Sequence, residues 1–82
     1  MPRALTLYTR RTCSLCDKMH AVVDRVRAQR EVDLLVLDLD TEAPAEKRAA
    51  YDWEVPVLEL DGRKVAKYRI EEERLLRLLD DG

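Results

Sequence analysis

The sequence predicts a single α/β domain with its elements in the order β-α-β-α-β-β-α. Two observations support this order. Apolar residues repeat with the period of strands in some segments and with the period of helices in others. In addition, an Asp-Gly pair, the strongest short-range signal for a hairpin, separates the last two strand-like segments. A chain of 82 residues has room for one small domain, residues 1–82.

The first half of the chain supplies two strands with a helix between them. Residues 5–9 alternate apolar and polar side chains, as strands do. From Leu15 to about Arg30, apolar residues recur at helical spacing and the other face is charged. Residues 33–40 form a nearly continuous apolar run, which predicts an interior strand covered on both faces. Because a helix joins the two strands, we expect them to be parallel with a right-handed crossover.

A short helix and a third strand follow. Residues 41–44 are typical of a helix start, because Pro44 in the first turn has no N–H to leave unpaired. The helix is expected to continue to about Tyr51. Residues 55–60 form the third predicted strand, and the proline near its start, Pro56, lies where a missing ladder hydrogen bond is tolerated.

The chain closes with a hairpin and a helix. The pair Asp61-Gly62 predicts a tight turn that leads into a fourth strand over residues 64–68, antiparallel to the third. The last helix is expected to start near Ile70, since the three glutamates that follow suit the positive end of a helix dipole. Its apolar side is supplied by four leucines, Leu75, Leu76, Leu78 and Leu79.

Composition and charge exclude several classes of protein. The 15 basic residues are balanced by 17 acidic ones and the signs are mixed along the chain, so we expect no nucleic-acid surface. Apolar runs reach only four or five residues, too few to cross a membrane. The first residues also lack the apolar stretch of a secretory signal. We therefore expect a cytoplasmic protein that binds no membrane, and we expect it to be a monomer.

Cys13 and Cys16 carry the clearest chemical signal. A disulfide between them closes so small a loop that it restrains little of the unfolded chain, so a structural bridge explains the pair poorly. The pair lies between the first strand and the first helix, where unpaired amides and the helix dipole lower the pKa of a thiol. Arg10 and Arg11 add positive potential. We expect Cys13 to attack a disulfide and Cys16, one turn later, to resolve the mixed disulfide.

Thr12 and His20 are polar neighbours of the two cysteines. Thr12 is expected to cap the helix or to donate a hydrogen bond to the Cys13 sulfur. His20 is expected to be a half-exposed helix residue. Its spacing from the cysteines leaves a Cys-Cys-His metal site as an alternative to redox chemistry, and such a site would need a fourth ligand. An inert buried cysteine pair is the second alternative.

Val55-Pro56 is the second signal. A trans proline at a strand start is one interpretation of this dipeptide. A cis proline would turn the backbone N–H and C=O of Val55 toward an open cleft, where an extended peptide could pair with them. Trp53, three residues before the proline, is expected to pack between the second helix and the third strand, with a substrate-facing position as the alternative. Tyr8 and Tyr68 have the same two interpretations.

These residues together resemble the glutaredoxin branch of the thioredoxin superfamily. The resemblance rests on Leu-Tyr-Thr-Arg-x-x-Cys-x-x-Cys over residues 7–16, on Val-Pro-Val over residues 55–57 and on the closing helix. It implies a thioredoxin-like fold, with a four-stranded mixed sheet flanked by three helices, and a cis Pro56. Arg10 stands where glutaredoxins often place a basic residue that meets a glutathione carboxylate. The chain departs from glutaredoxins after its fourth strand, where the Gly-Gly turn and the acidic residue are missing and Lys67 and Arg69 are basic.

The predicted function is a dithiol–disulfide oxidoreductase that reduces protein or low-molecular-weight disulfides. We expect no cofactor beyond the redox-active disulfide, with glutathione as a candidate co-substrate, and an electron donor that is either glutathione or a reductase. The alternatives are a thioredoxin-fold binding module with passive cysteines and a Cys-ligated metal or iron–sulfur site. The predicted catalytic residues are Cys13 and Cys16, and the predicted substrate contacts are Arg10, Thr12, Val55 and Pro56.

Overall fold

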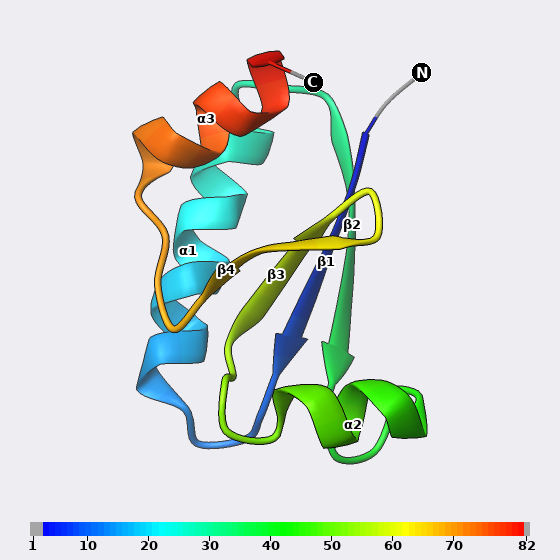
Figure 1. Ribbon diagram of the computed structural model, residues 1–82. Coiled ribbons are helices and arrows are strands. Elements are labelled where there is room, and N and C mark those ends of the chain that lie inside the picture. Colours follow the sequence, from blue (N-terminus) through cyan, green and yellow to red (C-terminus); the bar gives the residue numbers. More distant parts are fainter. Residues whose placement is uncertain (1–2, 82) are drawn as a thin grey trace.

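The computed structural model describes residues 3–81, and their strands and helices follow the predicted order (Figure 1). A four-stranded sheet has the order β2-β1-β3-β4. Strand β1 (Arg3–Thr9) pairs in parallel with β2 (Val32–Asp38). On its other side β1 pairs antiparallel with β3 (Val57–Leu60), which pairs antiparallel with β4 (Arg63–Lys67). The predicted mixed sheet is therefore confirmed.

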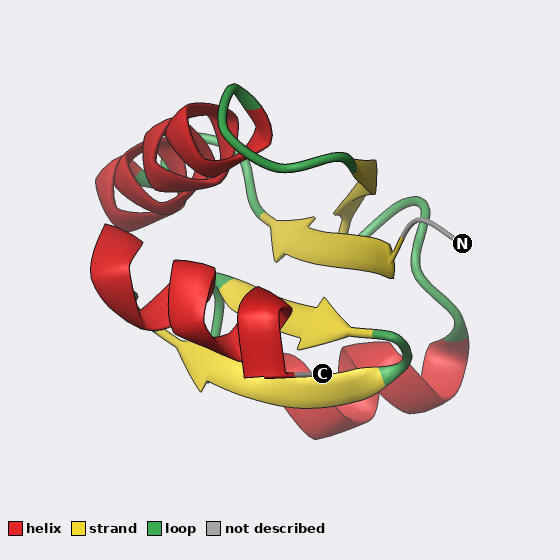
Figure 2. Cartoon of the chain, turned by 90° about the horizontal axis from the view of Figure 1, so that it is seen from above, coloured by secondary structure: helices red, strands yellow, loops and turns green. Residues whose placement is uncertain are grey.

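Helices cover both faces of this sheet. Helices α1 (Ser14–Arg27) and α3 (Glu72–Asp81) pack on one face, and the short helix α2 (Ala45–Tyr51) lies on the other (Figures 1 and 2). The alternation of side chains along the strands divides the interior accordingly, because neighbouring residues point to opposite faces. Within residues 3–81, no helix has both the length and the apolar content needed to cross a bilayer.

The two sides of the sheet have different interiors. The α1/α3 side is wholly apolar and includes the fully buried Met19, Leu58 and Leu75. The α2 side contains two tyrosines and a buried carboxylate. The main apolar core consists of Leu5, Leu7, Met19, Val23, Val26, Val32, Leu58, Leu60, Ile70 and Leu75.

Glu59 is the buried carboxylate, with 4% of its surface exposed. It accepts hydrogen bonds from Lys47 Nζ and from the Tyr51 hydroxyl, each at 2.7 Å. The bond with Glu59 raises the pKa of Lys47 to about 12, and burial followed by the Glu59 contact raises the pKa of Tyr51. Because both partners belong to α2, these contacts fasten the short helix to the centre of the sheet.

The prediction of an interior strand over residues 33–40 is wrong. Strand β2 ends at Asp38 and forms an edge of the sheet, where Leu35 is 54% and Val36 37% exposed. The apolar run has a different cause. Leu34 packs partly on the main core and Leu37 on the α2 side, so each face of an edge strand uses apolar residues.

Smaller differences concern the ends of elements. Pro44 is the N-cap of α2 with an extended ψ of 153°, so it precedes the first turn instead of lying in it. Helix α1 ends at Arg27, and the following residues continue only as a turn. The predicted hairpin turn is confirmed: Asp61 and Gly62 have φ values of 51° and 86°, and such positive values are typical of a two-residue hairpin turn.

Candidate active site

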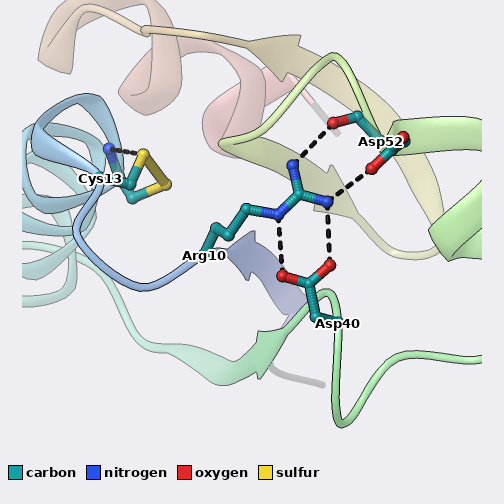
Figure 3. Close-up of a disulfide and its surroundings, with 5 residues drawn as sticks. Arg10, Cys13, Asp40 and Asp52 are labelled. Carbon is teal, nitrogen blue, oxygen red and sulfur yellow. Dashed lines mark hydrogen bonds and ion pairs between the residues drawn. A yellow bond between two sulfur atoms is a disulfide. The ribbon is translucent and has the colours of Figure 1, made fainter.

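Cys13 and Cys16 form a disulfide at the N-terminus of α1, with their Cα atoms 5.2 Å apart (Figure 3). Cys13 is the N-cap residue. Its sulfur accepts a hydrogen bond from the Cys16 backbone N–H at 3.1 Å, and its carbonyl accepts one from the Asp17 N–H. Cys13 is partly exposed, whereas Cys16 is only 3% exposed. The outer sulfur therefore faces the Cys16 amide of the first turn near solvent, and the inner sulfur is buried.

Thr12 does not cap α1, so the expectation that it caps this helix is wrong. The N-cap needs an extended backbone, which Cys13 has with φ −121° and ψ 104°. Thr12 instead has a φ of 49°, in the left-handed region that β-branched residues rarely adopt. The Cys13 sulfur takes the place of the usual cap oxygen. Thr12 is exposed beside the disulfide, and its contact with substrate stays a prediction.

Arg10 points away from the disulfide and toward two carboxylates (Figure 3). Its Nε and one terminal nitrogen each donate to Asp40 at 2.9 Å. Asp52 accepts from the same guanidinium through its carboxylate at 2.6 Å and through its backbone carbonyl at 2.9 Å. These contacts raise the pKa of Arg10 and lower that of Asp40. Arg10 thus joins three loops at this end of the sheet, and its predicted contact with a glutathione carboxylate would require an exchange of partners.

The Val55–Pro56 peptide bond is cis, as the resemblance implied. Pro56 is buried, and its carbonyl accepts a hydrogen bond from the Tyr68 N–H at 2.8 Å. Val55 is half-buried, and among residues 3–81 neither its N–H nor its C=O takes part in a backbone hydrogen bond. The peptide groups of Val55 are therefore free to pair with an added chain.

The expected packing of Trp53 is wrong. Trp53 is 86% exposed. The aromatic residue that packs between α2 and the sheet is Tyr51, which makes an edge-on contact with Tyr8. Tyr8 is accordingly a core residue with 4% exposure. Tyr68 is a surface residue, 41% exposed, and its hydroxyl donates to the Trp53 carbonyl at 2.8 Å.

The structure does not assemble the alternative metal site. His20 is partly exposed, and its Nε2 lies 3.7 Å from the Asp24 carboxylate, one turn further along α1. Across residues 3–81, no group of three or more His, Cys, Asp or Glu side chains is arranged to hold a metal ion. Cys13, Cys16 and His20 therefore do not form a three-ligand cluster in this disulfide-bonded form.

Comparison with known proteins places this site in a family context. The family model described as Glutaredoxin-like domain (DUF836) matches residues 4–80. A solved structure of the protein XcR50 from X. campestris is 32% identical, with 95% of this chain and 97% of that chain covered and a TM-score of 0.74. Protein Ne2328 from Nitrosomonas europaea is 25% identical, with 96% and 93% covered and a TM-score of 0.80.

A thioredoxin is also among the similar structures. A single-site mutant of thioredoxin from Halobacterium salinarum is 25% identical, with 96% of this chain and 73% of that chain covered and a TM-score of 0.69. No curated protein sequence matches the chain. The fold is therefore thioredoxin-like.

Proposed function

The chain belongs to the glutaredoxin-like domain family, and from this premise we propose that it is a dithiol–disulfide oxidoreductase acting through Cys13 and Cys16. One observation carries the proposal. The outer sulfur caps α1 and faces the Cys16 amide at 3.1 Å, while the inner sulfur is buried within bonding distance of it. A sulfur in the place of a cap oxygen is favoured as an anion by the first-turn amides and the helix dipole.

The first step is attack by Cys13 on the disulfide of a substrate. In the reduced protein, the Cys13 thiolate forms a new bond with one substrate sulfur, and the substrate S–S bond breaks. The second substrate sulfur leaves as a thiolate and takes up a proton. The product is a mixed disulfide between Cys13 and the substrate.

The second step releases the substrate. Cys16 loses its proton and attacks the Cys13 sulfur, which forms the disulfide seen in the structure and expels the remaining substrate thiol. Two electrons have then passed from the protein to the substrate. A thiol such as glutathione, or a protein reductase, must return two electrons to Cys13 and Cys16, so the protein acts as an electron carrier between a donor and a disulfide.

Substrate binding is assigned to the residues around the outer sulfur. An extended chain would pair with the unpaired peptide groups of Val55, next to the buried Pro56. Thr12 and Arg11 are exposed immediately before Cys13, so they would contact whatever is joined to that sulfur. Arg10 would hold the loop, and on releasing Asp40 or Asp52 it would donate to a substrate carboxylate instead.

A coupled turnover assay tests this function. The reduction of a disulfide substrate is followed as NADPH consumption, with glutathione and its reductase in one arm and thioredoxin reductase in the other. We expect turnover in at least one arm and none for Cys13→Ser. Cys16→Ser should still attack and accumulate a mixed disulfide detectable by mass. As a matched control, Leu35→Ala changes an exposed apolar residue of the edge strand and should turn over like the unchanged protein.

The passive binding module makes the opposite prediction. If the cysteines are incidental, neither arm shows turnover and Cys16→Ser forms no mixed disulfide. A separate result would contradict the two-step scheme itself. Full turnover of a protein disulfide by Cys16→Ser would show that the second thiol is not needed.

A further inference from the structure

Within residues 3–81, Trp53 is the most exposed of the large apolar residues. It is the chain's one tryptophan, and 86% of its surface is exposed, far more than Leu15 or Tyr68 at about two fifths each. A tryptophan side chain can bury a large apolar area and is among the residues that contribute most to binding interfaces. A single apolar residue on a surface needs no explanation by itself. A role of Trp53 therefore depends on the contacts that hold its backbone and on the residues around it.

The backbone on both sides of Trp53 is fastened. Asp52 is held by two contacts from Arg10, and the Glu54 carboxylate accepts from Lys64 at 2.7 Å. The Trp53 carbonyl itself accepts from the Tyr68 hydroxyl at 2.8 Å. A bulky side chain on a fixed backbone loses little entropy when a partner covers it, which is how interface anchors are built.

Tyr68 has a strained conformation that brings its contacts to this loop. Its φ is 68°, and the Arg69 N–H donates to the Lys67 carbonyl across it, so Tyr68 is the central residue of a γ-turn of the rarer, positive-φ form. The same residue donates its N–H to Pro56 and its hydroxyl to Trp53. Tyr68 therefore links the Trp53 carbonyl to Pro56 of the candidate active site through two hydrogen bonds.

Trp53 also lies close to the peptide groups proposed to bind substrate. It precedes Val55 by two residues of a turn, so the two Cα atoms lie no farther apart than the roughly 7 Å that an extended chain would span. Arg10, which holds Asp52, comes three residues before Cys13. Figure 1 shows the loop before α1 and the loop after α2 at the same end of the sheet. Trp53 thus belongs to the same loop as Val55, at the end of the sheet where Cys13 begins α1.

Three exposed basic residues of these loops favour a negatively charged partner. Arg11, Lys67 and Arg69 are exposed, and none of them forms an ion pair with any side chain of residues 3–81. The Lys67 ammonium lies 5.6 Å from the centre of the Tyr68 ring. Exposed cations that form no ion pair within residues 3–81, among them Lys67 over the Tyr68 ring, complement acidic residues on a bound chain.

We propose that the substrate of this site is a polypeptide disulfide with a bulky apolar residue and an acidic residue beside the reacting cysteine. The apolar side chain covers the Trp53 indole, and the acidic one faces Lys67 and Arg69. This inference rests on the proposed function, because it needs a substrate sulfur joined to Cys13. The chemistry is unchanged: two electrons pass from the two cysteines to the polypeptide disulfide, and two thiols are released.

Three substrates and two variants test the inference. The substrates are a short peptide disulfide with Leu and Glu beside its cysteine, the same peptide with Gly and Lys there, and bis(2-hydroxyethyl) disulfide. For Trp53→Ala we expect kcat/KM with the Leu/Glu peptide to fall about tenfold or more, as for an anchor residue. The loss with the small disulfide should be much smaller. Trp53→Phe should recover most of the activity, because a ring remains.

The possible results distinguish a failure of this inference from a failure of the proposed oxidoreductase function. Equal losses of Trp53→Ala on all three substrates, or no loss on the Leu/Glu peptide, would overturn the role of Trp53. Equal turnover of the two peptides by the unchanged protein would overturn the proposed sequence preference. If the unchanged protein reduces none of the three, the proposed function itself fails.

Fluorescence gives a second test that needs no turnover. Trp53 is the sole tryptophan, so its emission reports its surroundings directly. In the mixed disulfide of Cys16→Ser with the Leu/Glu peptide, we expect a shift to shorter wavelength and weaker quenching by acrylamide. The mixed disulfide with the Gly/Lys peptide is the control. A Trp53 that is quenched equally in both would show that no apolar side chain covers it.

Discussion

At one end of the sheet the polar side chains have hydrogen-bond and ion-pair partners, whereas at the other end an aromatic side chain is exposed and, within residues 3–81, peptide groups are unpaired. We define the closed end as the start of β1, the β3–β4 turn, the second half of α1 and helix α3, and the open end as residues 10–16, 52–56 and 67–69. At the closed end, Arg3 donates to the last carbonyls of α3 and to Asp61, whose other oxygen accepts from the Ala4 N–H. Two further ion pairs join α1 or its following turn to α3: Arg25–Glu72 and Arg30–Asp80, both at 2.8 Å.

The open end has the reverse character. Its loops are fastened to one another through Arg10 and Tyr68, yet the groups that point outward lack partners. Trp53 is exposed, and the peptide groups of Val55 make no backbone hydrogen bond within residues 3–81. A firmly held region that leaves such groups unpaired fits the substrate-binding role proposed above. We therefore expect stability to depend mainly on the closed end and reactivity on the open end.

The largest expected effect is on stability, from Leu75→Ala in α3. Leu75 is fully buried in the main core, so its truncation leaves a cavity and should lower the free energy of unfolding by about 3 kcal/mol. Urea denaturation measures this loss, and alkylation of reduced Cys13 measures reactivity. The comparison predicts that the alkylation profile of the folded variant is unchanged. A shift of that profile would show that the two ends are not independent.

A smaller loss is expected for Arg3→Ala. The change removes the side chain that donates to Leu78 and Leu79 at the end of α3, together with the pair to Asp61. Since these groups are partly exposed, we expect the free energy of unfolding to fall by about 1 kcal/mol. Arg77→Ala is the matched control, because Arg77 is exposed and forms no ion pair within residues 3–81. Equal losses for the two variants would rule out a specific role for Arg3.

The smallest effect is a dependence of stability on acid pH. The Ala4 N–H, and then Arg3, lower the pKa of Asp61, so its unfolded pKa of about 3.9 is higher than its folded one. Its contribution is therefore complete above about pH 4 and is lost as the pH falls through the folded pKa. In Asp61→Asn this contribution is missing at every pH. The difference in unfolding free energy between the two proteins should shrink below pH 4, and a constant difference would contradict the assignment.

Local signals explain what could be predicted from the sequence. The Asp61-Gly62 turn depends on the backbone preferences of two adjacent residues, and the structure confirms it. The place of Cys13 follows from a strand pattern that changes to a helix pattern within a few residues, and this also holds. The cis Pro56 followed from a family resemblance that rests on residues 7–16, residues 55–57 and the closing helix. The turn and the place of Cys13 are each encoded within a short segment.

The features that were missed depend on segments far apart in the chain. Arg10 is 30 residues from Asp40 and 42 from Asp52, and no local pattern marks these partners. The aromatic residue that packs on Tyr8 of the distant strand β1 is Tyr51 and not Trp53, and no local pattern distinguishes the two. The apolar run of β2 is the same for an interior strand as for an edge strand that packs on alternate faces, so the sequence could not distinguish them.

The central claim is that the first-turn amides of α1 favour Cys13 as a thiolate. It is tested most directly by the rate of iodoacetamide alkylation of the reduced Cys16→Ser variant across pH, since Cys13 is then the only thiol. The account predicts a midpoint well below about 8.5, the pKa of a free cysteine. A midpoint at the free value, with the reactivity of an ordinary peptide thiol, would contradict it.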